Sequence, residues 1–116
     1  MSRLIYKIAP EPLWRDAERA GTFAGAPVDL ADGFIHFSTA EQLAETAARH
    51  FAGQDGLVLV AIDETRLGDG LKYEPSRGGA LFPHLYGPLD LAAVVWVRPL
   101  PIGADGRHHF PPLERP

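Results

Sequence analysis

Residues 71–97 have the sequence LKYEPSRGGALFPHLYGPLDLAAVVWV, and this stretch decides the fold. It contains three segments with strand character, at 71–74, 81–86 and 92–97. Only short turns, centred on Gly78-Gly79 and Gly87-Pro88, separate these segments. Such connections are too short for the helix that must cross between parallel strands. The three strands are therefore predicted to pair mainly antiparallel, which argues against a doubly wound α/β fold.

Other strands are predicted from the pattern of apolar residues. Residues 57–62 (LVLVAI) have no polar side chain on either face, which predicts a central strand covered on both sides. Residues 92–97 are predicted to form a second buried strand. Pro83 lies inside residues 81–86 and cannot donate a backbone hydrogen bond, which favours an edge or irregular strand. Shorter strands are predicted at 4–8 and 33–37.

Two helices are predicted between these strands. The first follows Pro10-Glu11-Pro12 and ends at Gly21. The second begins at Ser38-Thr39, whose spacing to Glu41 and Gln42 matches capping boxes, and ends at Gly53. Residues 22–32 contain one glycine, one proline and two aspartates, which predicts a loop.

The order of elements predicts an α+β fold of two small, mainly antiparallel sheets with two helices. A length of 116 residues favours one domain, predicted over residues 1–100, with a Pro/Gly-rich C-terminal tail at 101–116.

Composition excludes several classes of function. The chain has no cysteine, so disulfides, thiolate catalysis and cysteine-bound metals are excluded. The net charge of −4 argues against nonspecific binding to nucleic acid or to anionic membranes. No segment approaches the ~20 apolar residues that a membrane-spanning helix needs, and the N-terminus lacks a signal-peptide pattern. We therefore expect a cytoplasmic protein.

One group of candidate site residues comprises His36, Ser38 and Thr39. These side chains lie where a predicted strand meets a predicted helix N-terminus, and such a position favours a phosphate or another anion. The structural alternative is that Ser38 and Thr39 only cap the helix and that His36 belongs to the fold.

Two further groups of polar residues follow, at 73–77 and 82–88. Glu74 is held before Pro75 and accompanied by Arg77, so its carboxylate could bind a ribose hydroxyl or stabilise an oxocarbenium ion; the alternative is a solvated turn. His84 and Tyr86 face the same way in an extended chain and could stack on a flat ligand; the alternative is an edge strand shaped by proline.

A metal-dependent hydrolase using His36 and His84 is a third, less favoured alternative. His36, His84 and Glu74 would satisfy a two-histidine, one-carboxylate ligand set, but they lie far apart in the sequence. We expect no metal cofactor.

The chain closely resembles the bacterial domain-of-unknown-function 952 family over about residues 4–100. The resemblance rests on residues 5–8 (IYKI), 14 (W), 33–38 (GFIHFS), 73–75 (YEP) and 82–89 (FPHLYGPL). It implies a fold like that of ADP-ribosyltransferases, in which two small sheets flank a cleft of NAD size. A more distant similarity to RNA 2′-phosphotransferases lies in the order of residues 4–8, 21, 35–38 and 57–63.

The resemblance implies a ligand and roles for particular residues. The cleft would bind a nucleotide or phosphorylated ligand, with NAD as the implied cofactor and transfer of ADP-ribose as the implied reaction. The implied catalytic residues are Glu74, His36 and His84. The implied ligand-binding residues are Lys7, Ser38, Thr39, Arg77 and Tyr86.

Residues 7–9 depart from the pattern of the related enzymes. Lys7-Ile8-Ala9 stands where many of them have His-Gly-Thr for binding the NAD ribose and adenosine. This departure supports an alternative function, a non-catalytic ligand-binding module that keeps the fold but has lost NAD chemistry.

Overall fold

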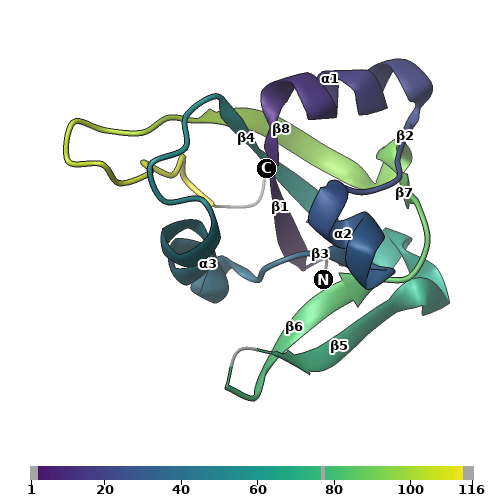
Figure 1. The fold of residues 1–116 in the computed structure, drawn as a ribbon. Helices are drawn as coiled ribbons and strands as arrows, with labels where there is room; N and C mark the ends of the chain where they lie inside the picture. Colours follow the sequence, from purple (N-terminus) through teal and green to yellow (C-terminus); the bar gives the residue numbers. More distant parts are fainter. Residues whose placement is uncertain (1–2, 77, 114–116) are drawn as a thin grey trace.

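The computed structural model, which describes residues 3–76 and 78–113, confirms the α+β class (Figure 1). One antiparallel sheet has the strand order β1-β4-β8, a second has the order β3-β6-β5, and β2 pairs with β7 in a small ribbon. The strands are β1 (Leu4–Pro10), β2 (Thr22–Phe23), β3 (Ile35–His36), β4 (Leu57–Asp63), β5 (Leu71–Ser76), β6 (Ala80–Leu85), β7 (Leu89–Asp90) and β8 (Val94–Leu100). Figure 1 shows the β5–β6 hairpin projecting away from the sheet that contains β1.

Strand β4 confirms the prediction of a central buried strand. It lies between β1 and β8, and every residue along it is buried. Because side chains alternate across a strand, Val58 and Val60 face one hydrophobic cluster with Trp14, while Leu59 and Ala61 face the other. The single strand therefore contributes to the core on both faces of its sheet.

The first predicted helix is confirmed, and the second is shorter than predicted. Helix α1 (Glu11–Ala20) ends at Gly21, whose φ of +83° is the left-handed conformation that glycine favours. After Thr39 the chain forms a short 3-10 turn before α3 (Leu43–His50) begins. Helix α3 thus ends before Gly53.

The prediction of a loop over residues 22–32 is wrong. This segment contains β2 and a third helix, α2 (Pro27–Asp32). Pro27 occupies the first helical turn, and Gly33 follows the helix with a φ of +86°. With only six residues, α2 is too short to show helical periodicity in its apolar side chains.

Two predictions about later strands are also wrong. Strand β6, which contains Pro83, is central in its sheet. Proline is tolerated there because Pro83 lies opposite Phe37, just past the end of the short strand β3. The Pro83 carbonyl still accepts a hydrogen bond from the Phe37 amide at 3.0 Å. Strand β8 is an edge strand of mostly half-buried residues, and residues 91–93 before it form a 3-10 turn.

The segment from Ile35 to Ser38 joins the two larger sheets. Ile35 and His36 pair with β6, whereas Ser38 exchanges two backbone hydrogen bonds with Tyr6 of β1, at 2.8 and 2.9 Å. His36 therefore lies where the two sheets meet.

Residues 102–113 fold back onto the domain. Ile102 forms a β-bridge with His108, and Phe110 and Leu113 pack against the cluster that includes Leu59. The Tyr6 hydroxyl donates a hydrogen bond to the Leu113 carbonyl at 3.1 Å. Across residues 3–76 and 78–113, no helix has the length and apolar character needed to cross a membrane.

Candidate functional site

A cleft of about 440 Å³ lies where β1, α2, α3 and β6 approach one another. This volume falls within the usual range for small-molecule sites, about 300–1,000 Å³. Four of the predicted site residues line it: Lys7, His36, Ser38 and His84. The fold thus brings together residues from the start, middle and end of the chain.

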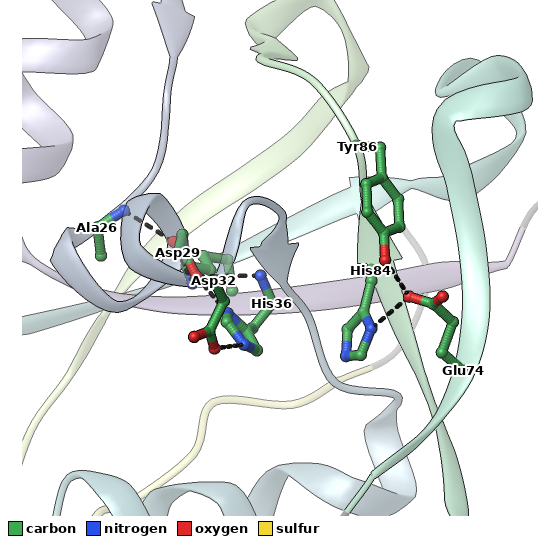
Figure 2. Close-up of polar contacts among 8 residues, drawn as sticks. Ala26, Asp29, Asp32, His36, Glu74, His84 and Tyr86 are labelled. Carbon is green, nitrogen blue, oxygen red and sulfur yellow. Dashed lines mark hydrogen bonds and ion pairs between the residues drawn. The ribbon is translucent and has the colours of Figure 1, made fainter.

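Asp29, on α2, is the buried centre of one side of the site. Its carboxylate accepts hydrogen bonds from Lys7 Nζ at 2.9 Å, from His36 Nδ1 at 2.6 Å and from the Ala26 amide at 2.7 Å, and the His36 amide is also within 3.1 Å (Figure 2). Burial alone would raise the pKa of Asp29, but the bond from His36 and the charge of Lys7 outweigh it and lower the pKa to about 2. Asp29 is therefore an anion that holds α2, β1 and β3 together.

Lys7 is buried beside Asp29. Its Nζ lies 2.8 Å from the second oxygen of that carboxylate. Burial lowers the pKa of Lys7, and the ion pair with Asp29 opposes this effect only in part. The ammonium charge of Lys7 is thus balanced inside the protein.

His36 is held at both ends of its ring. Nδ1 faces Asp29, and Nε2 lies 2.9 Å from Oδ2 of Asp32, which is the last residue of α2 (Figure 2). Ionised carboxylates can only accept hydrogen bonds. The two contacts are therefore both hydrogen bonds from His36 in the form of the ring that carries a proton on each nitrogen.

A second histidine–carboxylate pair lies on β5 and β6. Oε1 of Glu74 accepts hydrogen bonds from His84 Nδ1 at 2.9 Å and from the Tyr86 hydroxyl at 2.7 Å (Figure 2). These two bonds lower the pKa of Glu74, and the bond to Glu74 raises the pKa of Tyr86. Because Nδ1 donates to Glu74, Nε2 of the neutral His84 ring is its acceptor nitrogen.

The two pairs are neighbours because His36 and His84 are directly opposite in the β3–β6 ladder. Their ring centroids are 5.5 Å apart. The ring of Phe34 stacks on His84 at 4.1 Å, and it lies 4.6 Å from His36 and 5.3 Å from Tyr86. The result is a continuous group of four rings on one face of the sheet.

The remaining predicted site residues have other surroundings. The Ser38 hydroxyl is buried and lies 2.8 Å from that of Thr46 on α3. Thr39 begins the 3-10 turn, where its amide donates to the Gln42 side chain at 3.1 Å, and it does not line the cleft. Glu74 and Tyr86 reach the cleft only through His84. Arg77 lies outside the described residues.

Three residues of the site were not predicted from the sequence: Asp29, Asp32 and Phe34. Phe34 could have been found, because it is two residues before His36 and so shares its face of the strand. The two aspartates lie on α2, whose only sequence signals are Pro27 at its start and Gly33 after its end. Among residues 3–76 and 78–113, no three histidine or acidic side chains are grouped as ligands for one metal ion.

Comparisons with known proteins agree with this architecture. The crystal structure of protein CC0527 from Caulobacter crescentus is similar, with a TM-score of 0.87, 52% sequence identity, and coverage of 91% of this chain and 93% of that one. The solution NMR structure of the same protein gives a TM-score of 0.81 at 53% identity, with 90% of each chain covered. No curated protein matches the chain. Residues 8–97 match the family described as "Protein of unknown function (DUF952)", and the chain therefore belongs to that family.

Proposed function

We propose that the cleft binds a nucleotide or a related phosphorylated small molecule, on which His36 and His84 act. The observation that carries this proposal is the convergence of two histidine–carboxylate pairs, from different elements, on one cleft of about 440 Å³. A histidine whose ring is oriented by a carboxylate is a common general base or acid in enzymes.

In this proposal His84 is the proton acceptor. Glu74 fixes the orientation of the ring through Nδ1, which leaves Nε2 to take the proton. Glu74 is thus a positioning residue, and His84 is the catalytic residue. The Tyr86 hydroxyl holds the same carboxylate oxygen from the other side.

The aromatic group supplies a surface for a flat ring. Phe34 and Tyr86 continue outward from the two histidines on the same face, and Tyr86 is exposed. Stacking of a base on an aromatic side chain contributes about 1–3 kcal/mol in nucleic-acid complexes. A nucleotide would therefore place its base on these rings and its phosphate near His36.

NAD is the cofactor that the family resemblance implies. The aromatic rings fit its planar bases, and His36 and Ser38 are the lining residues suited to its ribose and phosphate oxygens. Bound NAD would supply the glycosidic bond to nicotinamide that is cleaved in ADP-ribosyl transfer. The non-catalytic alternative is favoured by Lys7, whose charge is taken up by Asp29 at the position where the enzymes that the chain resembles have histidine.

Titration by NMR tests the binding site. We expect AMP, ADP-ribose and NAD, each added to ¹⁵N-labelled protein, to shift the resonances of Phe34, His36 and His84. His84→Ala should weaken binding by up to about tenfold, because a ligand hydroxyl loses its acceptor at Nε2. His109→Ala is the matched control, because His109 is exposed outside the cleft. Absence of shifts at the two cleft histidines with all three ligands would contradict the proposal.

Release of nicotinamide separates the two candidates. Turnover of NAD by the wild type, reduced in a Glu74→Gln variant that still binds ligand, would identify an enzyme. Binding without turnover in both proteins would identify the non-catalytic module.

A further inference from the structure

The two aspartates that contact His36 differ in how firmly they are held. Asp29 is 1% exposed and accepts hydrogen bonds from three residues. Asp32 is 48% exposed, and in the part of the chain that the structure describes its carboxylate has one partner, His36 Nε2 at 2.9 Å. Asp29 is therefore a fixed part of the fold, whereas Asp32 can leave its position without exposing a buried group.

The position of Asp32 also does not favour the helix on which it lies. It is the last residue of α2, where the helix dipole favours a positive charge over a negative one. An exposed ion pair contributes little to stability, so the contact with His36 is easily replaced. The contacts of the Asp32 carboxylate thus do not stabilise this end of the helix.

Displacement of Asp32 would expose an anion site. Asp32 and His36 both line the cleft. Lys7 and Asp29 neutralise each other, and Nε2 of His36 points to the place that the Asp32 carboxylate holds. In the doubly protonated form of the ring, the positive charge of His36 would have no counter-ion once Asp32 leaves. A phosphate oxygen has the charge and the acceptor capacity to replace a carboxylate oxygen there.

We propose that Asp32 occupies the phosphate subsite of the cleft and that a phosphomonoester displaces it from His36 Nε2. This inference rests on the proposed function and specifies it: the ligand carries a terminal phosphate, and the contact between Asp32 and His36 keeps the site closed in the ligand-free protein. Specificity arises because a neutral ligand gains nothing from displacing a carboxylate.

The test compares Asp32→Ala with the wild type. We expect the variant to bind 5′-AMP and inorganic phosphate about tenfold more tightly, because the competing carboxylate is gone, while affinity for adenosine stays unchanged. The ¹H–¹⁵N signals of the His36 ring should shift with the two phosphate-containing ligands alone. Equal affinity for inorganic phosphate and AMP would indicate a site for free phosphate, and tighter binding of AMP would indicate a site for a nucleotide phosphate.

Asp16→Ala is the control for net charge. Asp16 is an exposed acid on α1 that pairs with Arg19, so this variant has the same charge change away from the cleft. It should leave all affinities unchanged. An Asp32→Asn variant, which keeps the side-chain size, should show a smaller gain in the same direction.

The outcomes separate this inference from the proposed function. If the wild type binds AMP with shifts at His84 but Asp32→Ala binds it no more tightly, the subsite is wrong and the proposed function stands. Weaker binding by Asp32→Ala would show that Asp32 assists the ligand, which also overturns the inference. If neither protein binds any phosphorylated ligand, both proposals are wrong.

Discussion

At the scale of single residues, Asp29 explains why the cleft has its shape. A carboxylate that is almost fully buried is costly unless donors surround it. Here the donors come from β1, from the start of α2 and from β3, so the same bonds that stabilise the charge also fix three elements relative to one another. The ring of His36 is oriented as a consequence of this network.

The acid stability of the protein should report on Asp29. Its pKa is lowered from 3.8 to about 2 in the folded state, so its stabilising contribution is complete above about pH 4 and is lost as the pH falls toward 2. A shift of this size corresponds to about 2 kcal/mol of unfolding free energy. Urea denaturation between pH 2 and pH 6 measures it.

Asp29→Asn should lack this part of the pH dependence. At neutral pH it should be less stable by about 3 kcal/mol, because Lys7 is left buried without a counter-ion. Asp16→Asn is the control, since an exposed carboxylate should leave the acid limb unchanged. An acid limb in Asp29→Asn equal to that of the wild type would show that other carboxylates carry it.

At the scale of elements, strong local signals predicted the fold correctly and weak ones did not. Strand β4 is predicted from its continuous apolar run, and helix α1 from the proline at its start and the glycine after its end. Each signal lies within the element or next to it. The composition of strand β8 resembles that of β4 and so predicts a buried strand, but only tertiary pairing decides which strand is central.

The same reasoning applies to the candidate site. His36 and His84 were predicted because polar residues stand out in apolar strands. Their pairing in the β3–β6 ladder is not predictable from the sequence, because Pro83 favours an edge strand. The sequence does not show that the backbone N–H which Pro83 lacks would face the end of β3. The carboxylates of Asp29 and Asp32 were missed together with α2.

Because α2 carries Asp29 and Asp32, a substitution at Gly33, just after its end, should affect both stability and the site. Gly33→Ala should destabilise the protein by about 1 kcal/mol, because alanine at a φ of +86° is strained although its methyl group would meet no atom within 4 Å. Gly21→Ala is a matched control at the end of α1, with a φ of +83° and equally open surroundings. Both should show similar losses in thermal denaturation.

The two variants should differ at the site. Only Gly33→Ala alters the helix that carries Asp29 and Asp32, so only this variant should shift the ring resonances of His36. Equal shifts in both variants would show that α2 does not control the histidine.

At the scale of the whole molecule, two hydrophobic clusters lie on opposite faces of one sheet. Trp14, from α1, belongs to the cluster that includes Val60, and Trp96, from β8, packs against the cluster that includes Leu59. Strand β4 contributes alternate residues to both clusters. Loss of packing on one face would therefore disturb β4 and, with it, the packing on the other face. The domain should therefore unfold as one unit.

The two tryptophans of the chain allow a direct test of this cooperativity. Trp96→Phe leaves Trp14 as the fluorescent probe of one face, and Trp14→Phe leaves Trp96 as the probe of the other. In each variant the fluorescence transition in urea should coincide with the far-UV circular dichroism transition. Leu59→Ala, added to either variant, should lower the unfolding free energy by about 3 kcal/mol. Leu59 lies on the same face of the sheet as Trp96. If the domain unfolds as one unit, Leu59→Ala should shift the transition reported by Trp14 as much as the transition reported by Trp96. A shift only in the Trp96 transition would show that the two faces unfold separately.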